Sequence, residues 1–168
     1  MMLQVVSYIV EKHHKQKRMG GAPYVSHPIE VAKILESKGL TGDILYVGLL
    51  HDILEDTDGT ALEILSMTNQ SVLDDVILLT KVKGVSTEEY LGEIMKSMRA
   101  RLAKLADRLH NLQSAFVASS EFQARYIKET ETYYLSLAKG TVFEQDIAEA
   151  LFNLKQFREN KNKTNKQT

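Results

Sequence analysis

The chain has 168 residues, of which 43% are hydrophobic and 26% charged, and this is the composition of one ordinary globular domain. Its net charge of -1 argues against a general nucleic-acid binder, which would carry a strong basic excess. The lack of cysteine excludes a disulfide framework, a thiolate metal site and a thiolate nucleophile. No apolar run approaches the roughly 18 residues that span a membrane, and the N-terminus is apolar first and basic afterwards, the reverse of a secretory signal. We therefore expect a cytoplasmic protein without a nucleic-acid or membrane partner.

Helical periodicity and helix caps divide the chain, whereas no alternating strand pattern is strong. Helices are predicted, in chain order, over about residues 2–15, from Pro28 to Gly39, from Thr41 to Asp52, from Thr60, over 72–79, from Ser86 toward Met98, and over about 99–113, 120–138 and 142–157. Ser26 or His27 is expected to cap the second of these helices, and Thr41 the third. Capping boxes open two others, at Thr60–Glu63 and Ser86–Glu89.

The fold class that follows is all-α, a single bundle of about eight to ten helices. This domain is expected to span residues 1–158, because the sequence shows neither an internal repeat nor a linker. The segment from Glu159 onward contains no apolar residue that could join a core. We therefore expect residues 159–168 to form a disordered polar tail.

The most informative stretch is a His-Asp pair followed closely by a Glu-Asp pair: His51, Asp52, Glu55 and Asp56. The apolar run 44–50 precedes it, so an imidazole and a carboxylate stand together at the end of a buried helix. Such a pair is half of a site for a divalent metal with nitrogen and oxygen ligands. Helical spacing places each member of the second pair one turn after a member of the first, which clusters groups able to bind a metal or move a proton. The alternative is a helix end that turns polar as it reaches solvent.

Completing such a site requires further histidine or carboxylate side chains. His27 lies beside a proline at a helix start, and Asp107 lies next to an apolar stripe, where burying an unpaired carboxylate is costly. His27 could instead be a simple N-terminal cap, and Asp107 could form an ion pair with Arg108 or Lys104. Asn111 follows Asp107 by one turn and shares its helix face, so it would point into the same cavity.

The stretch from His13 to Arg18 adds basic charge just before a Gly-Gly turn. A charge run is usually only a solvated helix face. This one lies close in sequence to His27, so it could instead flank a pocket for phosphates. Arginine suits that role, because its planar fork can grip a phosphate or stack on a base.

Three blocks of sequence make the chain resemble the HD-domain phosphohydrolases, specifically the hydrolase domain of the RelA/SpoT homologues. HHKQKRMGGAPYVSHP is similar to the family's H-x-x-Q-x-R…G-x-P-Y-x-x-H-P, GLLHDILEDTD is similar to A-L-L-H-D-x-x-E-D-T, and KLADRLHNL is an almost literal match. A weaker block, KETETYYLSLA, resembles R-E-T-x-x-x-Y-x-x-L-A. The blocks follow one another in the family's order over about residues 13–138.

The resemblance implies metal-dependent removal of the 3′-pyrophosphate from guanosine tetra- and pentaphosphate, ppGpp and pppGpp, leaving GDP or GTP. The metal ligands that it implies are His27, His51, Asp52 and Asp107. Manganese is the expected metal, and such a ligand set also accepts iron, zinc or nickel. The residues implied to position and activate water are Glu55 and Asp56. The implied substrate contacts are Lys17, Arg18, Lys81, Asn111, Ser114 and Tyr134.

The chain departs from the family pattern at positions that border the nucleotide. Met19 and Gly20 stand where relatives often carry a basic residue and a serine, and residues 112–114 replace Met-Arg-Thr. These changes bear on base selectivity rather than on the chemistry. Two alternatives stay open: a phosphatase of another nucleotide, such as a nucleoside monophosphate or the 2′-phosphate of NADPH, and a non-catalytic alarmone sensor. The chain is too short to add the synthetase domain of long relatives, so we expect a small stand-alone hydrolase, with an oligomer possible.

Overall fold

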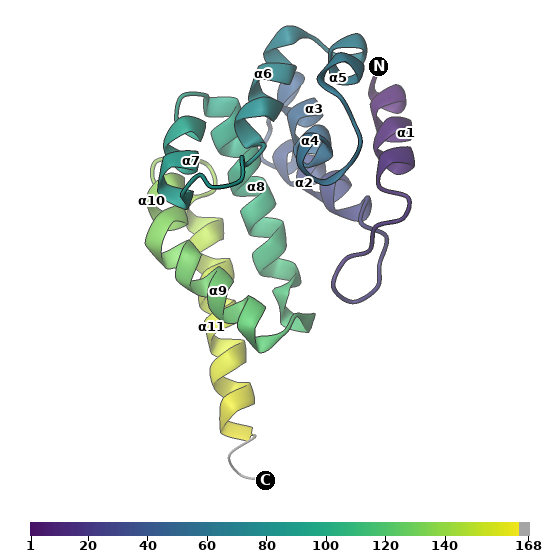
Figure 1. Ribbon diagram of the computed structural model, residues 1–168. Coiled ribbons are helices and arrows are strands. Elements are labelled where there is room, and N and C mark those ends of the chain that lie inside the picture. The colour runs from purple at the N-terminus through teal and green to yellow at the C-terminus, as the bar shows by residue number, and fades with distance from the viewer. Residues whose placement is uncertain (165–168) are drawn as a thin grey trace.

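The structure is a computed structural model that describes residues 1–164, except for the side chains at positions 162 and 164. Its helices are, in chain order, α1 (Met2–Lys12), α2 (Ser26–Ser37), α3 (Asp43–Leu50), α4 (Ile53–Asp56), α5 (Ala61–Met67), α6 (Gln70–Leu79), α7 (Thr87–Ile94), α8 (Met98–Ser114), α9 (Ser120–Glu129), α10 (Leu135–Ala138) and α11 (Glu144–Thr164) (Figure 1). A 3₁₀ turn, Ala115–Val117, follows α8, and a π-helical segment, Thr130–Tyr134, joins α9 to α10. Residues 1–164 contain no strand, so the all-α prediction is confirmed. None of these helices combines the length and apolar character that crossing a membrane requires.

Two helix starts are capped as predicted. The Thr60 hydroxyl accepts the Glu63 backbone N–H, and the Glu63 carboxylate accepts the Thr60 backbone N–H, which completes a capping box at α5. Ser86 and Glu89 make the same reciprocal pair at α7. Each box satisfies backbone N–H groups that the first turn of a helix leaves without partners.

Two other caps were predicted wrongly. α2 begins at Ser26, and Val25, which occupies the cap position, already has helical backbone angles. The helix therefore starts earlier than predicted, and the Ser26 hydroxyl donates to the Pro23 carbonyl instead of capping the helix. Gly42, not Thr41, precedes α3. Its φ of 76° lies in the left-handed region that glycine enters without strain, and this residue turns the chain into α3.

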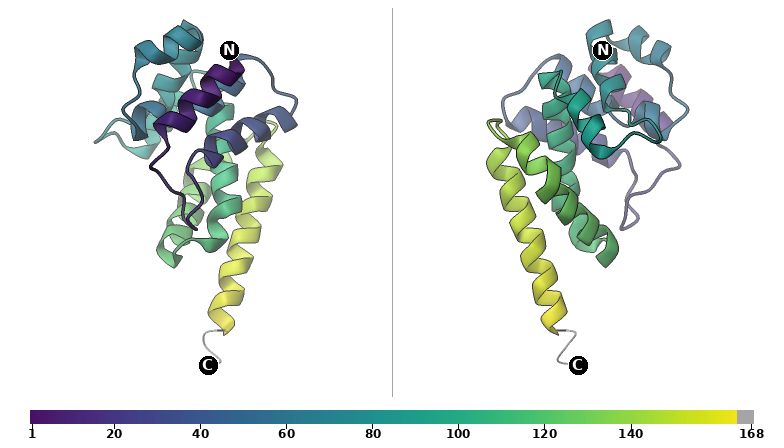
Figure 2. Two further views of the ribbon diagram at one scale, coloured as in Figure 1. Left: turned by 90° about the vertical axis from the view of Figure 1, so that its right-hand side faces the viewer. Right: turned by 60° about the vertical axis from the view of Figure 1, so that its left-hand side comes forward.

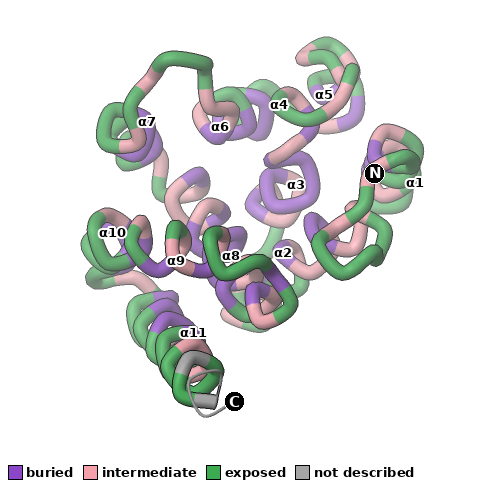
Figure 3. Tube along the Cα trace, turned by 60° about the horizontal axis from the view of Figure 1, so that its bottom comes forward, coloured by how far each residue is buried: buried purple, intermediate pink, exposed green. Residues whose placement is uncertain are grey.

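The short helix α3 occupies the centre of the molecule. It is buried on nearly all sides, and α1, α2, α6 and α8 pack around it (Figure 3). A Cβ atom on Gly48 would lie 2.7 Å from Cδ1 of Leu35 and 3.6 Å from Cα of Ala32, so glycine permits the close approach of α3 to α2. This contact brings the start of α2 close to the end of α3.

α8 separates the two halves of the bundle. It packs against α2 and α3 on one side and against α11 on another, with α9 and α10 completing the cover (Figure 2). Its buried residues include small alanines beside leucines, which let neighbouring helices approach closely. α9, the π-helical segment and α10 follow without a break, as expected for one helix over 120–138.

The ends of three helices differ from the prediction. The first helix ends at Lys12, and the third ends at Leu50 before α4 restarts at Ile53. α11 continues through residues 159–164, which were predicted to be disordered. Extending an existing helix costs little, and lysine and glutamate favour helix, so this segment needs no apolar face of its own. Residues 165–168, the rest of the expected tail, lie outside the described residues.

Candidate active site

Side chains from three parts of the fold meet at one point. His27 lies in the first turn of α2, His51 and Asp52 lie between α3 and α4, and Asp107 lies in α8. Nε2 of His27 is 3.1 Å from Oδ1 of Asp107 and 3.7 Å from Oδ2 of Asp52. Nε2 of His51 is 3.0 Å from Oδ2 of Asp52 and 3.9 Å from Oδ1 of Asp107. The residues expected to hold a metal are therefore neighbours in the structure, and we call them the ligand cluster.

The donor atoms of this cluster fit a divalent metal. Nδ1 of His51 hydrogen-bonds the Gly48 carbonyl at 2.8 Å, which turns Nε2 toward the carboxylates. That Nε2 atom is buried and has no hydrogen-bond partner of good geometry. Ligand atoms of His27, His51 and Asp107 all lie within 4.8 Å of one another. Buried imidazole nitrogens that face carboxylate oxygens form a nitrogen and oxygen donor set suited to a transition metal.

The carboxylates set the protonation of the histidines. Burial alone would lower the pKa of His51, but the Asp52 carboxylate beside it raises that pKa to about 9. Burial lowers the pKa of His27. Burial alone would raise the pKa of Asp107, yet the Lys104 ammonium and the two histidines hold it well below the usual value. A proton and a metal ion would thus compete for Nε2 of His51.

Tyr24 joins the ligand cluster to the second acidic pair. Its hydroxyl donates to Oδ2 of Asp52 at 2.5 Å and lies 3.3 Å from Oδ2 of Asp56. Burial and the charge of Asp52 raise the pKa of Asp56. Oε2 of Glu55 accepts the backbone N–H of Lys81 at 3.0 Å. Glu55 and Asp56, which lie about one helical turn after His51 and Asp52, therefore each have a hydrogen-bond partner that fixes the carboxylate.

A cleft of about 370 Å³ opens beside the ligand cluster. Glu55 lines it, together with three expected substrate contacts, Lys17, Arg18 and Asn111. The Arg18 guanidinium donates to Oδ1 of Asn111 at 3.0 Å and to Oγ of Ser114 at 2.8 Å. The loop between α1 and α2 is thereby tied to α8, and the guanidinium is held in the cleft wall.

Three other expected substrate contacts do not line this cleft: Lys81, Ser114 and Tyr134. The Lys81 ammonium donates to Thr87 at 3.1 Å. Ser114 supports Arg18. Tyr134 is buried, with the Arg108 guanidinium 3.7 Å from its ring centre. Of these three residues, Ser114 contacts a residue of the cleft lining through its side chain, namely Arg18.

The cleft also contains aromatic residues that sequence reasoning did not single out: Tyr24, Phe122 and Tyr126. The Phe122 and Tyr126 rings are stacked, with centres 4.1 Å apart. Tyr24 stands within the quoted block PYVSHP, and that position was a usable signal. For the α9 pair no comparable signal exists, because aromatic residues at helical spacing are usually core residues.

Asp107 forms an ion pair with Lys104 and not with Arg108, the two cations considered as its partners. The Lys104 ammonium lies 2.9 Å from Oδ2 of Asp107, whereas Arg108 pairs with Glu129 at 3.1 Å. Burial alone would lower the pKa of Lys104, but the Asp107 carboxylate raises it well above the usual value. Asp107 thus has an ion-pair partner on one oxygen while its other oxygen faces the histidines.

His110 stands behind His27 in the same way. The Nδ1 atoms of the two rings are 2.6 Å apart, and the rings are stacked with centres at 4.9 Å. One of the two nitrogens must carry the shared proton. This contact fixes the His27 ring so that its Nε2 faces Asp107, as outer partners of metal-binding histidines commonly do.

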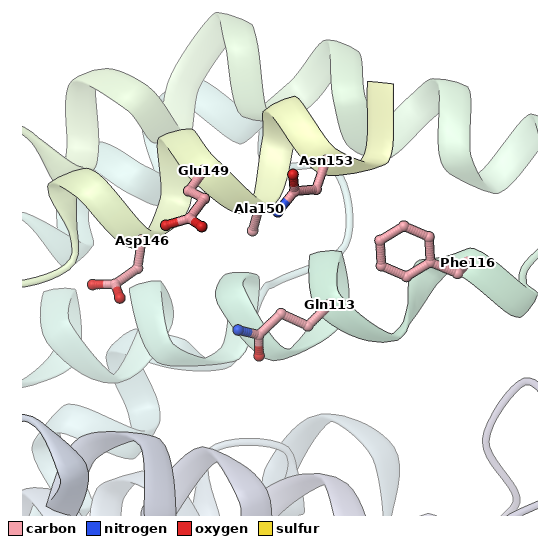
Figure 4. A pocket seen from close by; sticks show the side chains of 6 residues that line it. All are labelled: Gln113, Phe116, Asp146, Glu149, Ala150 and Asn153. Carbon is pink, nitrogen blue, oxygen red and sulfur yellow. The ribbon is translucent and has the colours of Figure 1, made fainter. Parts of the chain in front are cut away.

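A second hollow, of about 180 Å³, lies between α8 and α11 (Figure 4). Asp146 and Glu149 project into it from α11, opposite Gln113 of α8. It is lined by no histidine, and Asp146 already pairs with Lys38 at 2.7 Å. The cleft beside the ligand cluster is therefore the candidate active site.

Comparison with known proteins shows which family the chain belongs to. A protein-family model described as "HD domain" matches residues 6–141. A GTP pyrophosphokinase of Brucella melitensis is 37% identical over 158 residues, which cover 88% of this chain and 21% of that protein. A guanosine-3′,5′-bis(diphosphate) 3′-pyrophosphohydrolase of Aquifex aeolicus is 38% identical over 136 residues, which cover 76% of this chain and 20% of that protein. The chain thus spans about a fifth of the length of the curated relatives that it matches.

The fold also matches a solved structure. A metazoan ortholog of SpoT, described as hydrolysing ppGpp and acting in starvation responses, superposes with a TM-score of 0.78 at 27% sequence identity. The match covers 90% of this chain and 93% of that one. The metazoan protein, unlike the longer relatives, is therefore similar to this chain over nearly its whole length.

Proposed function

Since the chain belongs to the HD domain family, we propose that it is a metal-dependent phosphohydrolase that removes the 3′-pyrophosphate from ppGpp and pppGpp. The products are pyrophosphate and GDP or GTP. The observation that carries this proposal is the ligand cluster, with Glu55 and three cationic or amide side chains in the wall of the adjoining cleft. The activities named for the Aquifex and metazoan proteins support the choice of substrate. Guanine nucleotides are free in the cytoplasm, where we place the protein.

The proposed metal ligands are the four residues of the ligand cluster: His27, His51, Asp52 and Asp107. Their nitrogen and oxygen donor atoms, which face one another at the end of α3, fit manganese, our proposal for the native ion. When bound, such a cation acts as a Lewis acid that lowers the pKa of water and offsets charge on the phosphate.

Glu55 lines the cleft, and we propose that its carboxylate accepts the proton of the attacking water. The water oxygen forms a bond to the phosphorus attached to O3′, and the bond between that phosphorus and O3′ breaks. Pyrophosphate leaves, and the proton held by the acidic pair is available to O3′, which becomes a hydroxyl. Asp56 is the second acid of the pair, and Tyr24 holds it against Asp52.

Lys17, Arg18 and Asn111 are the proposed nucleotide contacts, because they line the cleft. The fork of Arg18 can grip a phosphate or stack on the base. Ser114 orients Arg18, and Lys81 orients Glu55 through its backbone N–H. Tyr134 packs against Arg108, whose guanidinium also lies over the ring of Tyr126 in the cleft lining.

An assay on ppGpp with separate readouts for pyrophosphate and orthophosphate tests this function. We expect manganese-dependent release of pyrophosphate and GDP, which stops when a chelator is added. Release of orthophosphate from NADPH or a nucleoside monophosphate, with no turnover of ppGpp, would favour a different nucleotide phosphatase. Binding of ppGpp without turnover by the metal-loaded protein would favour a sensor.

A further inference from the structure

Lys104 is a cation held in the cleft wall. Its side chain is 16% exposed, and its ammonium lies 2.9 Å from Oδ2 of Asp107 and 5.6 Å from the centre of the Tyr90 ring. Of the residues that the structure describes, Asp107 alone forms an ion pair with it. An ammonium carries three N–H donors, so Lys104 retains donors beyond those that Asp107 needs. Because Lys104 lines the cleft, a ligand there can reach it.

The charges around Lys104 favour an anionic ligand. Asp52 and Asp107 together balance the charge of one divalent cation, so a filled ligand cluster leaves Lys104 as a surplus positive charge in a largely buried setting. A buried unpaired charge is costly. The negative charge of Glu55, which also lines the cleft, is outweighed by the positive charges of Lys17 and Arg18 in the same lining. An anion entering the cleft would offset the surplus charge of Lys104.

We propose that Lys104 contacts a phosphate oxygen of the ligand and thereby forms, on the α8 side of the cleft, a phosphate subsite next to the ligand cluster. The ligand class is a pyrophosphate or phosphate ester. The subsite rests on the proposed function and deepens it, since it names the residue that binds the reacting phosphate. Lys17 and Arg18 come from the loop before α2 and also line the cleft, where they would contact the rest of the nucleotide.

Calorimetry of inorganic pyrophosphate binding to the manganese-loaded protein tests the subsite. Lys104→Gln keeps an N–H donor for Asp107 and removes the charge. We expect it to weaken pyrophosphate binding about ten- to a hundredfold, the value of one charge-assisted hydrogen bond, while manganese affinity is kept. Lys12→Gln is the matched control, because Lys12 is 13% exposed and pairs with Asp58 and Glu63 away from the cleft. That control should bind pyrophosphate as the wild type does.

Two outcomes would overturn the subsite: wild-type pyrophosphate affinity in Lys104→Gln, or loss of manganese binding in that variant, which would make Lys104 only a support for Asp107. If the variant does not fold, NMR of the wild-type protein, labelled with ¹⁵N-lysine and loaded with zinc in place of manganese, tests the subsite. Pyrophosphate is expected to shift the Lys104 ammonium resonance, and an unchanged resonance would overturn the subsite. Dependence of pyrophosphate binding on Lys104 without ppGpp turnover would uphold the subsite and refute the proposed substrate. Turnover of ppGpp together with pyrophosphate binding that is unchanged in Lys104→Gln would uphold the proposed substrate and refute the subsite.

Discussion

Tyr24 connects a proposed metal ligand, Asp52, with the second acid of the pair, Asp56, through one hydroxyl group. Removing that hydroxyl in Tyr24→Phe keeps the ring that packs against His13 and frees the carboxylates of Asp52 and Asp56 to rotate. Outer partners of metal ligands are commonly worth about ten- to a hundredfold in affinity or activity. We expect kcat to fall by about that factor and manganese affinity to fall less. Unchanged kcat and unchanged manganese affinity would show that the hydroxyl positions neither group.

Glu55 and Asp52 should fail in different ways when they are replaced. Glu55→Gln keeps the shape of a side chain that is not in the ligand cluster, so manganese binding should persist while kcat falls by about 10²- to 10⁴-fold. Asp52→Ala removes an oxygen next to both histidines and should abolish manganese binding itself. Calorimetry with manganese and steady-state kinetics measure the two effects. Full activity in Glu55→Gln would refute its assignment.

At the scale of elements, the turn that follows α4 is held by close packing at Gly59. A Cβ atom there would lie 2.7 Å from the Tyr8 hydroxyl and closer still to Cγ2 of Ile53, a buried side chain with little freedom to move. Gly59→Ala should therefore lower the free energy of unfolding by about 1–3 kcal/mol. Gly92→Ala in α7 is the control, because a Cβ atom added there would meet open space. This substitution should raise the free energy of unfolding by up to about 1 kcal/mol, since alanine favours helix over glycine. Urea denaturation of both variants decides, and equal effects would contradict this packing.

How far the sequence predicts these elements depends on the range of each interaction. The capping boxes at α5 and α7 and the apolar run of α3 are local patterns, so the helices that they define could be predicted. The neighbouring His51 and Asp52 were visible for the same reason. The contact of Tyr24 with Asp52 depends on how α2 packs against α3, and a helical pattern does not fix that register. The break between α3 and α4 also escaped prediction, because residues 51–52 continue a helical pattern.

At the scale of the whole molecule, the ligand cluster makes the stability of the metal-free protein depend on pH. The pKa of His51 rises from 6.5 to about 9 on folding, so its contribution is present below pH 6.5 and is lost as the pH rises through about 9. Urea denaturation in chelator should show a loss of roughly 3 kcal/mol at most over that range. Manganese requires neutral His51, so its stabilising effect should grow over the same range. His51→Gln should flatten the profile, and a flat profile in the wild-type protein would contradict this charge assignment.

The most direct test of the account is hydrolysis of ppGpp in water enriched in ¹⁸O with manganese present. Attack of water on the phosphorus attached to O3′ predicts that the label enters the released pyrophosphate, that GDP stays unlabelled, and that Asp52→Ala forms neither product. Label in GDP would show that carbon–oxygen cleavage occurs instead. Release of single phosphates, or no reaction by the folded, manganese-loaded protein, would contradict the proposed hydrolase.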